Sequence, residues 1–189
     1  GVAGPGLRSL VARGLLDPTR TVEDPLADPL RLALDVATAA DESVRVVCVG
    51  IDDAWAGAWY VSGKLGVVHH SAPVGIDALA VMTDVSVRSA VSDLWRMLSP
   101  GTDLRPDGAM RTIDLDGAWK SLAGGTASTC GDETVQAVMT LLATRFDARK
   151  VTTARFVQLS ESGVWMVHPD GHLIRDGVVP PILQVLVPE

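Results

Sequence analysis

Two stretches of the chain share a Gly-x-Trp-x-Val pattern, a glycine-bearing turn and a following leucine, and this repeat limits the folds available to the chain. The stretches begin at residues 57–61 and 163–167, which puts Trp59 and Trp165 at matching positions. A β-rich run precedes each stretch, and an amphipathic segment with helical spacing precedes each run. The pattern predicts an α+β fold made of a duplicated helix–strand–strand–strand–helix unit. We expect a mainly antiparallel sheet with helices packed on it and a pseudo-two-fold relation between the halves.

The boundary between the halves is marked by a segment rich in turn residues. Residues 99–109 carry two prolines and two glycines and predict a linker. Residues 1–98 then form the first half-repeat and residues 110–189 the second. A chain of 189 residues is of ordinary single-domain size, so we expect the halves to share one core.

Local patterns predict the individual elements. Apolar residues at helical spacing indicate helices, whereas short β-branched runs around glycine turns indicate strands and hairpins. Residues 178–187 are apolar and fit either a final helix or an edge strand, and as an edge strand they would allow a homodimer. The predicted helices are 7–15, 28–37, 74–98 with a break near 83–84, a short one containing Trp119, and 132–146; the predicted strands are 44–51, 111–115 and 152–159, with hairpins at 59–69 and 163–175.

The helix at 132–146 has the clearest pattern. Asp132 fits a helix N-cap, and the apolar residues then follow at helical intervals. Leu142 lies in the middle of this stripe, so we expect it to face the core. The stripe consists of Val135, Val138, Met139, Leu142 and Phe146.

Charge and composition exclude several classes of protein. The formal net charge is −7, and the 16 basic residues are scattered, which argues against binding to a nucleic-acid backbone. Two cysteines exclude a disulfide-dense scaffold. No apolar run approaches the ~20 residues of a membrane span, and the opening residues lack a signal-peptide pattern. We therefore expect a cytoplasmic protein that binds neither membrane nor nucleic acid.

Three residues are the best candidates for an enzyme site. Cys130 precedes the predicted helix, whose dipole would lower its pKa, while Asp132 and Glu133 act in the opposite sense. His168 and His172 flank a Pro-Asp-Gly turn, so their imidazoles are expected to face each other across a hairpin. No positioned base can be assigned to Cys130 from sequence, so we expect no catalytic residue.

We also expect no metal and no cofactor. Two imidazoles with Asp170 or Asp176 nearby fall short of a stable set of metal ligands. The glycines of residues 57–64 have the wrong spacing for a phosphate-binding loop. Residues 112–123 end in Ala123, where a calcium loop needs a bidentate glutamate.

The five tryptophans outnumber the two phenylalanines and one tyrosine. Trp55 follows Asp52 and Asp53 in a predicted loop, and Trp119 lies in a segment of mixed character. Exposed tryptophan is enriched at binding hot spots, so we predict Trp55 and Trp119 as residues that contact a partner. Partial burial in the core is the alternative for both.

The layout of the chain, in which a helix-then-strand pair is followed by a hairpin once in each half, resembles the EspG family of type VII secretion systems in mycobacteria and relatives over most of its length, most clearly in the second half. The resemblance is carried by residues 132–142, then Val151 to Leu159, then Glu161 to Ile174, which follow that family's order of helix, alternating strand and glycine-bearing hairpin. It implies a cytosolic chaperone, without enzymatic activity, that holds secreted PE–PPE pairs. This chain is shorter, and the helical bundle used for client binding is not evident.

Two other functions fit the sequence. One is an enzyme with a site around Cys130, His168 and His172. The other is an interaction domain of a larger actinobacterial protein.

Overall fold

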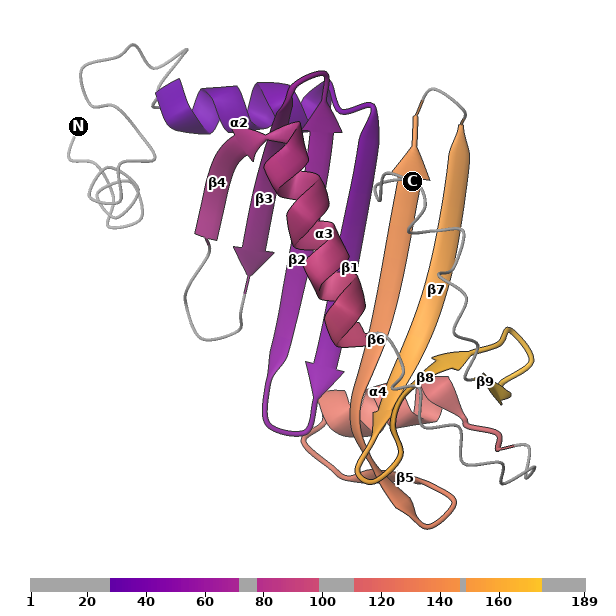
Figure 1. The fold of residues 1–189 in the computed structure, drawn as a ribbon. Coiled ribbons are helices and arrows are strands. Elements are labelled where there is room, and N and C mark those ends of the chain that lie inside the picture. The colour runs from indigo at the N-terminus through magenta and orange to yellow at the C-terminus, as the bar shows by residue number, and fades with distance from the viewer. Residues whose placement is uncertain (1–27, 72–77, 99–110, 147–148, 175–189) are drawn as a thin grey trace, which may run out of the picture.

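The computed structural model describes residues 28–71, 78–98, 111–146 and 149–174. Its strands form one open antiparallel sheet in the order β4-β3-β2-β1-β6-β7-β8-β9, with β5 paired to the beginning of β6 (Figure 1). The two halves therefore share one sheet, because β1 of the first half pairs with β6 of the second. The expectation of an α+β fold with a mainly antiparallel sheet is confirmed.

The first half of the chain forms one side of this sheet. Its first helix, strand and hairpin lie where the sequence predicts them, whereas the region predicted as a helix over 74–98 contains a strand and becomes helical at Asp84. The elements are α2 (Asp28–Thr38), β1 (Glu42–Gly50), β2 (Ala54–Ser62), β3 (Leu65–Ser71), β4 (Ala78–Thr83) and α3 (Asp84–Leu98).

The second half forms the other side. The short helix containing Trp119 is confirmed, with Asp114 as the N-cap that accepts a hydrogen bond from the Gly117 N–H. Residues 7–15, 178–187 and the linker 99–109 lie outside the described residues. The elements are α4 (Leu115–Ala123), β5 (Ser128–Cys130), β6 (Glu133–Arg145), β7 (Lys150–Leu159), β8 (Gly163–Val167) and β9 (Leu173–Ile174).

The predicted helix over 132–146 is wrong, because this segment is the long central strand β6. A shift in the pairing between β6 and β7 falls between Val135 and Ala137. Such a bulge changes the alternation of faces, so Val135 and Val138, three residues apart, pack in the same cluster. The bulge accounts for the interval from Val135 to Val138, and burial of both faces of β6 makes the adjacent Val138 and Met139 both apolar, so together they imitate helical spacing. Leu142 is partly exposed, while Leu141 beside it is fully buried.

The three helices of the described residues cover the two faces of the sheet unequally. Trp59 and Tyr60 are neighbours on β2 and point to opposite faces, Trp59 into the cluster with α3 and Tyr60 toward α2. On β6, Val138 lies in the cluster that includes Ala118 and Leu122 of α4, which we call the α4 cluster. Met139 lies in the cluster that includes Val87, Val91 and Leu94 of α3, which we call the α3 cluster. The helix α3 therefore covers one face, and α2 and α4 lie near opposite ends of the other (Figure 1).

The proposed equivalence of the two Gly-x-Trp hairpins is wrong at the level of residues. Gly57 lies in the middle of β2, whereas Gly163 opens β8. Trp59 is 2% exposed and packs in the α3 cluster, while Trp165 is partly buried in the α4 cluster on the other face. The short pattern matched strands with different places in the sheet order.

Among the described residues, no helix combines the length and the apolar character needed to cross a membrane.

Candidate functional site

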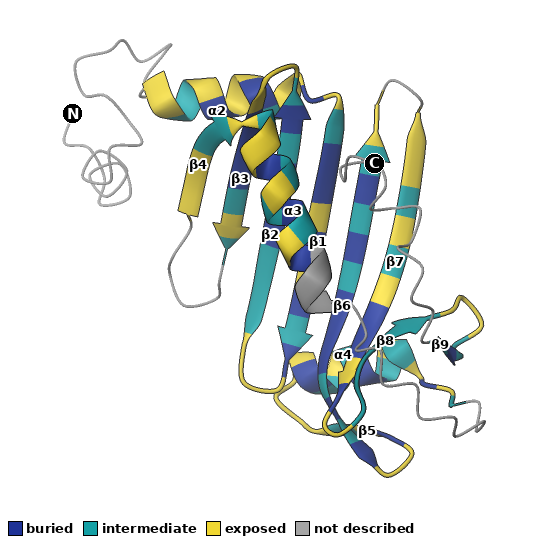
Figure 2. Ribbon diagram, in the orientation of Figure 1, coloured by how far each residue is buried: buried dark blue, intermediate teal, exposed yellow. Residues whose placement is uncertain are grey.

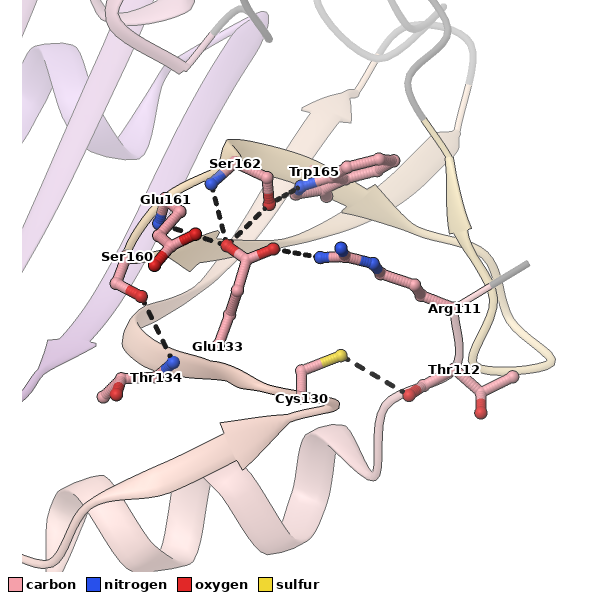
Figure 3. Close-up of polar contacts among 9 residues, drawn as sticks. All are labelled: Arg111, Thr112, Cys130, Glu133, Thr134, Ser160, Glu161, Ser162 and Trp165. Carbon is pink, nitrogen blue, oxygen red and sulfur yellow. Dashed lines mark hydrogen bonds and ion pairs between the residues drawn. The ribbon is translucent and has the colours of Figure 1, made fainter. Parts of the chain in front are cut away.

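A buried carboxylate organises one end of the sheet. Glu133 begins β6 and is 4% exposed. The backbone N–H groups of Glu161 and Ser162 donate to its Oε2 over 3.1 and 2.7 Å, and the Ser162 hydroxyl donates over 2.9 Å. Arg111 forms an ion pair with Oε1 (Figure 3). Trp165 completes the group by donating from Nε1 to Ser162 Oγ over 2.8 Å.

These partners keep Glu133 ionised. Burial acts to raise the pKa of the carboxyl, but the Arg111 ion pair and the donors from Ser162 and Glu161 outweigh it and lower the pKa to about 2. Both carboxylate oxygens are occupied by partners from the chain itself. The arrangement is that of a structural clamp that joins the segment at 111, the β7–β8 turn and β6.

The clamp could not have been found from sequence. Arg111 and Glu133 are 22 positions apart, and the β7–β8 turn comes 28 positions after Glu133. A glutamate next to Asp132 fits an exposed residue equally well, so no local pattern marks it as buried.

Cys130 lies beside this clamp and is buried, with 3% of its surface exposed. Its thiol donates to the Thr112 carbonyl over 3.5 Å. Burial raises the pKa of the thiol, and the Glu133 carboxylate adds to this, although Arg111 opposes it. Because Cys130 ends a strand rather than preceding a helix, no helix dipole acts on it. Its surroundings favour the neutral thiol, the opposite of what a nucleophilic cysteine requires.

The two candidate histidines share one carboxylate. Nδ1 of His168 is 2.7 Å from Asp170 Oδ1, and Nδ1 of His172 is 2.8 Å from the same oxygen. The His172 backbone N–H and both imidazoles lower the pKa of Asp170. The turn brings the two rings together as predicted, with Gly171 at φ 88°. Thr112 lies between this turn and Cys130. Its carbonyl accepts a hydrogen bond from the Cys130 thiol, and its backbone forms an isolated β-bridge with His172.

No group of three or more His, Cys, Asp or Glu side chains in the described part of the chain is arranged to hold a metal ion.

The predicted partner-contact residues, Trp55 and Trp119, are both partly buried and lie apart from each other. Trp55 is in β2 rather than in a loop, pairs with Cys48 of β1 and packs against the α3 cluster. Trp119 of α4 packs in the cluster on the opposite face. The structure does not bring them into one surface.

A surface that the sequence did not indicate lies between α2 and α4 on the face they share. Helix α2 packs on Tyr60, Val67 and Val81, and the α4 cluster includes Val138 and Val157, which leaves two rows of side chains between them. We call these rows the open strip. It consists of Arg45, Leu142 and Thr153 in one row and Ala56, Val47, Thr140 and Arg155 in the other.

Val47 is the central apolar residue of the open strip. It is 43% exposed, although β1 is hydrogen-bonded on both edges and the flanking Val46 and Cys48 are buried on the other face. The run at 44–51 is almost wholly apolar, which predicts an interior strand covered on both faces. Its strand assignment is confirmed, but within the described part of the chain the second face is only partly covered. The alternation of exposed and less exposed positions can be followed along β7 in Figure 2.

Two arginines stand at opposite corners of the open strip. The Arg45 guanidinium lies 5.5 Å from the centre of the Tyr60 ring, a cation–π contact. Arg155 Nη1 lies 3.8 Å from Asp116 Oδ1 of α4, and both side chains are exposed, at 52% and 81%. The open strip thus combines a small apolar centre with two accessible cations.

No protein-family model and no curated protein matches this chain.

Proposed function

We propose that this protein is a protein-binding module that receives its partner on the open strip. The observation that carries the proposal is the exposure of Val47 at the centre of a paired sheet, between two helices of the same face. Apolar side chains scattered at the rim of a protein need no explanation. A β-branched residue in the middle of a sheet is different, because the fold normally covers such a position.

Burial of the apolar side chains of the open strip would contribute a modest share of the binding free energy. Complete burial of a valine side chain is worth about 1.5–3 kcal/mol, and Val47 is already partly buried, so its share is about 1 kcal/mol. Leu142 and Ala56 lie beside it in the strip and add apolar area. Arginine at the edge of such a surface is typical of binding sites, in which a few residues supply most of the affinity.

We further propose that the protein is a cytoplasmic chaperone related in plan to EspG proteins and that its two halves arose by duplication. The sheet order supports the duplication, because a helix precedes a four-stranded meander in each half, with the short strand β5 between α4 and the second meander, and the meanders meet at the β1–β6 pair. In this arrangement β1 corresponds to β6 and β2 to β7, a different alignment from that of the two tryptophan hairpins. The client would be a secreted protein held before export.

Site-specific photo-crosslinking tests the binding function. A photoreactive amino acid replaces Val47 in cells of the source organism, and a matched variant carries it at Val85 of α3, which is 70% exposed. We expect a discrete heavier adduct from position 47 and none from position 85, and mass spectrometry then shows whether the adduct contains a secreted protein. Equal adducts at both positions, or none at 47, would contradict the proposal.

A further inference from the structure

We propose that the open strip binds an acidic amphipathic helix of the partner protein. Two carboxylates of this helix reach Arg45 and Arg155, and the apolar side chains between them pack on Val47 and Leu142. This inference rests on the proposed function and names the chemistry of the partner. It starts from charge: two of the seven residues of the open strip are arginines and none is acidic.

The charge of the strip is opposite to that of the molecule. The whole chain has a formal net charge of −7, so its general field repels an acidic partner. An acidic segment that docks here must therefore be held by the two local guanidinium groups. Such local complementarity selects a partner and its orientation more than it adds affinity.

Both guanidinium groups are able to bind a carboxylate. Arg45 lies against Tyr60, and stacking on an aromatic ring leaves the N–H groups at the edge of a guanidinium open to an anion. The Arg155–Asp116 pair is long, at 3.8 Å, and solvent-exposed, so it is weak and a partner carboxylate can replace it.

The sheet register sets the spacing of the partner's charges. Arg45 lies opposite Leu142 and Arg155 lies opposite Thr140, with β6 between the two arginines. Two strand spacings and a two-residue offset separate their Cα atoms by about 12 Å. Residues seven apart on one face of a helix are separated by about 10.5 Å, which long side chains easily adjust. If the two carboxylates are at positions i and i+7 of the partner helix, the residues at i+3 and i+4 lie over Leu142 and Val47.

Two fluorescent helical peptides test this spacing and charge. Both have an alanine- and glutamine-based scaffold with leucines at i+3 and i+4; one carries glutamates at i and i+7, and the other carries lysines there. Binding to the full chain is measured by anisotropy at low and high salt. We expect the acidic peptide to bind about ten-fold more tightly at low salt, with the difference much reduced at high salt.

Charge-reversed variants assign the effect to the strip. Arg45→Glu/Arg155→Glu should reverse the preference between the peptides, and Arg45→Gln/Arg155→Gln should remove it. Lys64→Glu/Lys150→Glu makes the same total change in charge at exposed positions elsewhere and should keep the preference. Unchanged thermal melts show that each variant is folded.

The outcomes separate this inference from the proposed function. Equal binding of both peptides, lost in Val47→Asp, would overturn the acidic partner and leave the strip as an apolar docking surface. Binding of neither peptide would overturn the inference, while crosslinking at position 47 still reports on the function. A dimer in sedimentation that Arg45→Glu/Arg155→Glu dissociates would assign the strip to a second copy of the chain and would also overturn it.

Discussion

The guanidinium of Arg111 is paired with the buried carboxylate of Glu133, and this contact joins the segment before α4 to the first residue of β6. The Glu161 and Ser162 amides bind the same carboxylate from the β7–β8 turn. Three separate parts of the chain thus depend on one ionised group. The clamp is structural, and it fixes the end of the sheet on which α4 packs.

The clamp predicts a stability that depends on pH. The carboxyl of a glutamate ordinarily has a pKa of 4.5, and the folded state lowers that of Glu133 to about 2, so folding favours the ionised form. Its contribution is therefore complete above pH ~5 and is lost as the pH falls toward ~2. The full contribution is on the order of 3 kcal/mol. Urea unfolding at a series of pH values should show this loss.

Glu133→Gln supplies the control for that measurement. The variant should be destabilised at pH 7, because Arg111 loses its ionic partner, and it should lose much less further stability between pH 5 and 2 than the wild-type chain. An equal acid dependence in both proteins would show that other carboxyl groups are responsible.

Adjacent leucines on β6 test the strand assignment. Leu141 is fully buried in the α3 cluster, whereas Leu142 lies in the partly exposed open strip. Leu141→Ala should cost about 2–5 kcal/mol, and Leu142→Ala about 1 kcal/mol or less. A helix with Leu142 facing the core would give the reverse order in denaturant unfolding.

The approach of α3 to the sheet depends on Gly66. A Cβ atom at this buried position would overlap Val87 Cγ2 and crowd the Tyr60 carbonyl. Gly66→Ala should therefore cost about 1–3 kcal/mol in a thermal or denaturant melt. In the double variant with Val87→Ala, the cost of adding the methyl group should fall, which a double-mutant cycle measures. Strict additivity would contradict the contact.

Both described cysteines should be slow to react. Cys130 and Cys48 are buried and form no disulfide, and burial raises the pKa of Cys48 to about 11. We expect iodoacetamide to label native protein at pH 7.5 only as fast as the protein opens, and to label unfolded protein rapidly. Rapid labelling of Cys130 in the native state would instead favour the enzyme hypothesis.

The sequence predicts the elements formed by short-range patterns. The strand at 44–51, the hairpins around Gly63 and Gly171 and the helix capped by Asp114 all follow from local turn and capping chemistry. Prediction failed at β6, where a bulge between Val135 and Ala137 and burial of both faces together imitate helical spacing. It also failed over 78–83, where the apolar run predicts a helix but forms β4; the break predicted near 83–84 does mark the change from strand to helix, and Thr83 Oγ1 accepts a hydrogen bond from the Ser86 N–H at the start of α3.

The candidate site was less accessible to sequence reasoning. Tryptophan composition selected Trp55 and Trp119, but the sheet places them in different clusters. Val47 has no distinguishing sequence feature. Among the described elements, α2 and α4 lie at opposite ends of this face and leave Val47 between them, and nothing in the local sequence fixes where a helix crosses a sheet.

The central claim is that Val47 serves binding rather than folding. Val47→Thr keeps the β-branched shape and removes apolar surface, and Val85→Thr is the matched control at an exposed site on the other face. The deciding measurement uses the partner protein identified by crosslinking at position 47. The amount of this partner that co-purifies with each variant is compared between variants of equal thermal stability. We predict a several-fold loss of co-purified partner for Val47→Thr and no loss for Val85→Thr. The free energy of unfolding of both variants should stay within about 0.5 kcal/mol of the wild-type value. Undiminished co-purification with Val47→Thr would contradict the account.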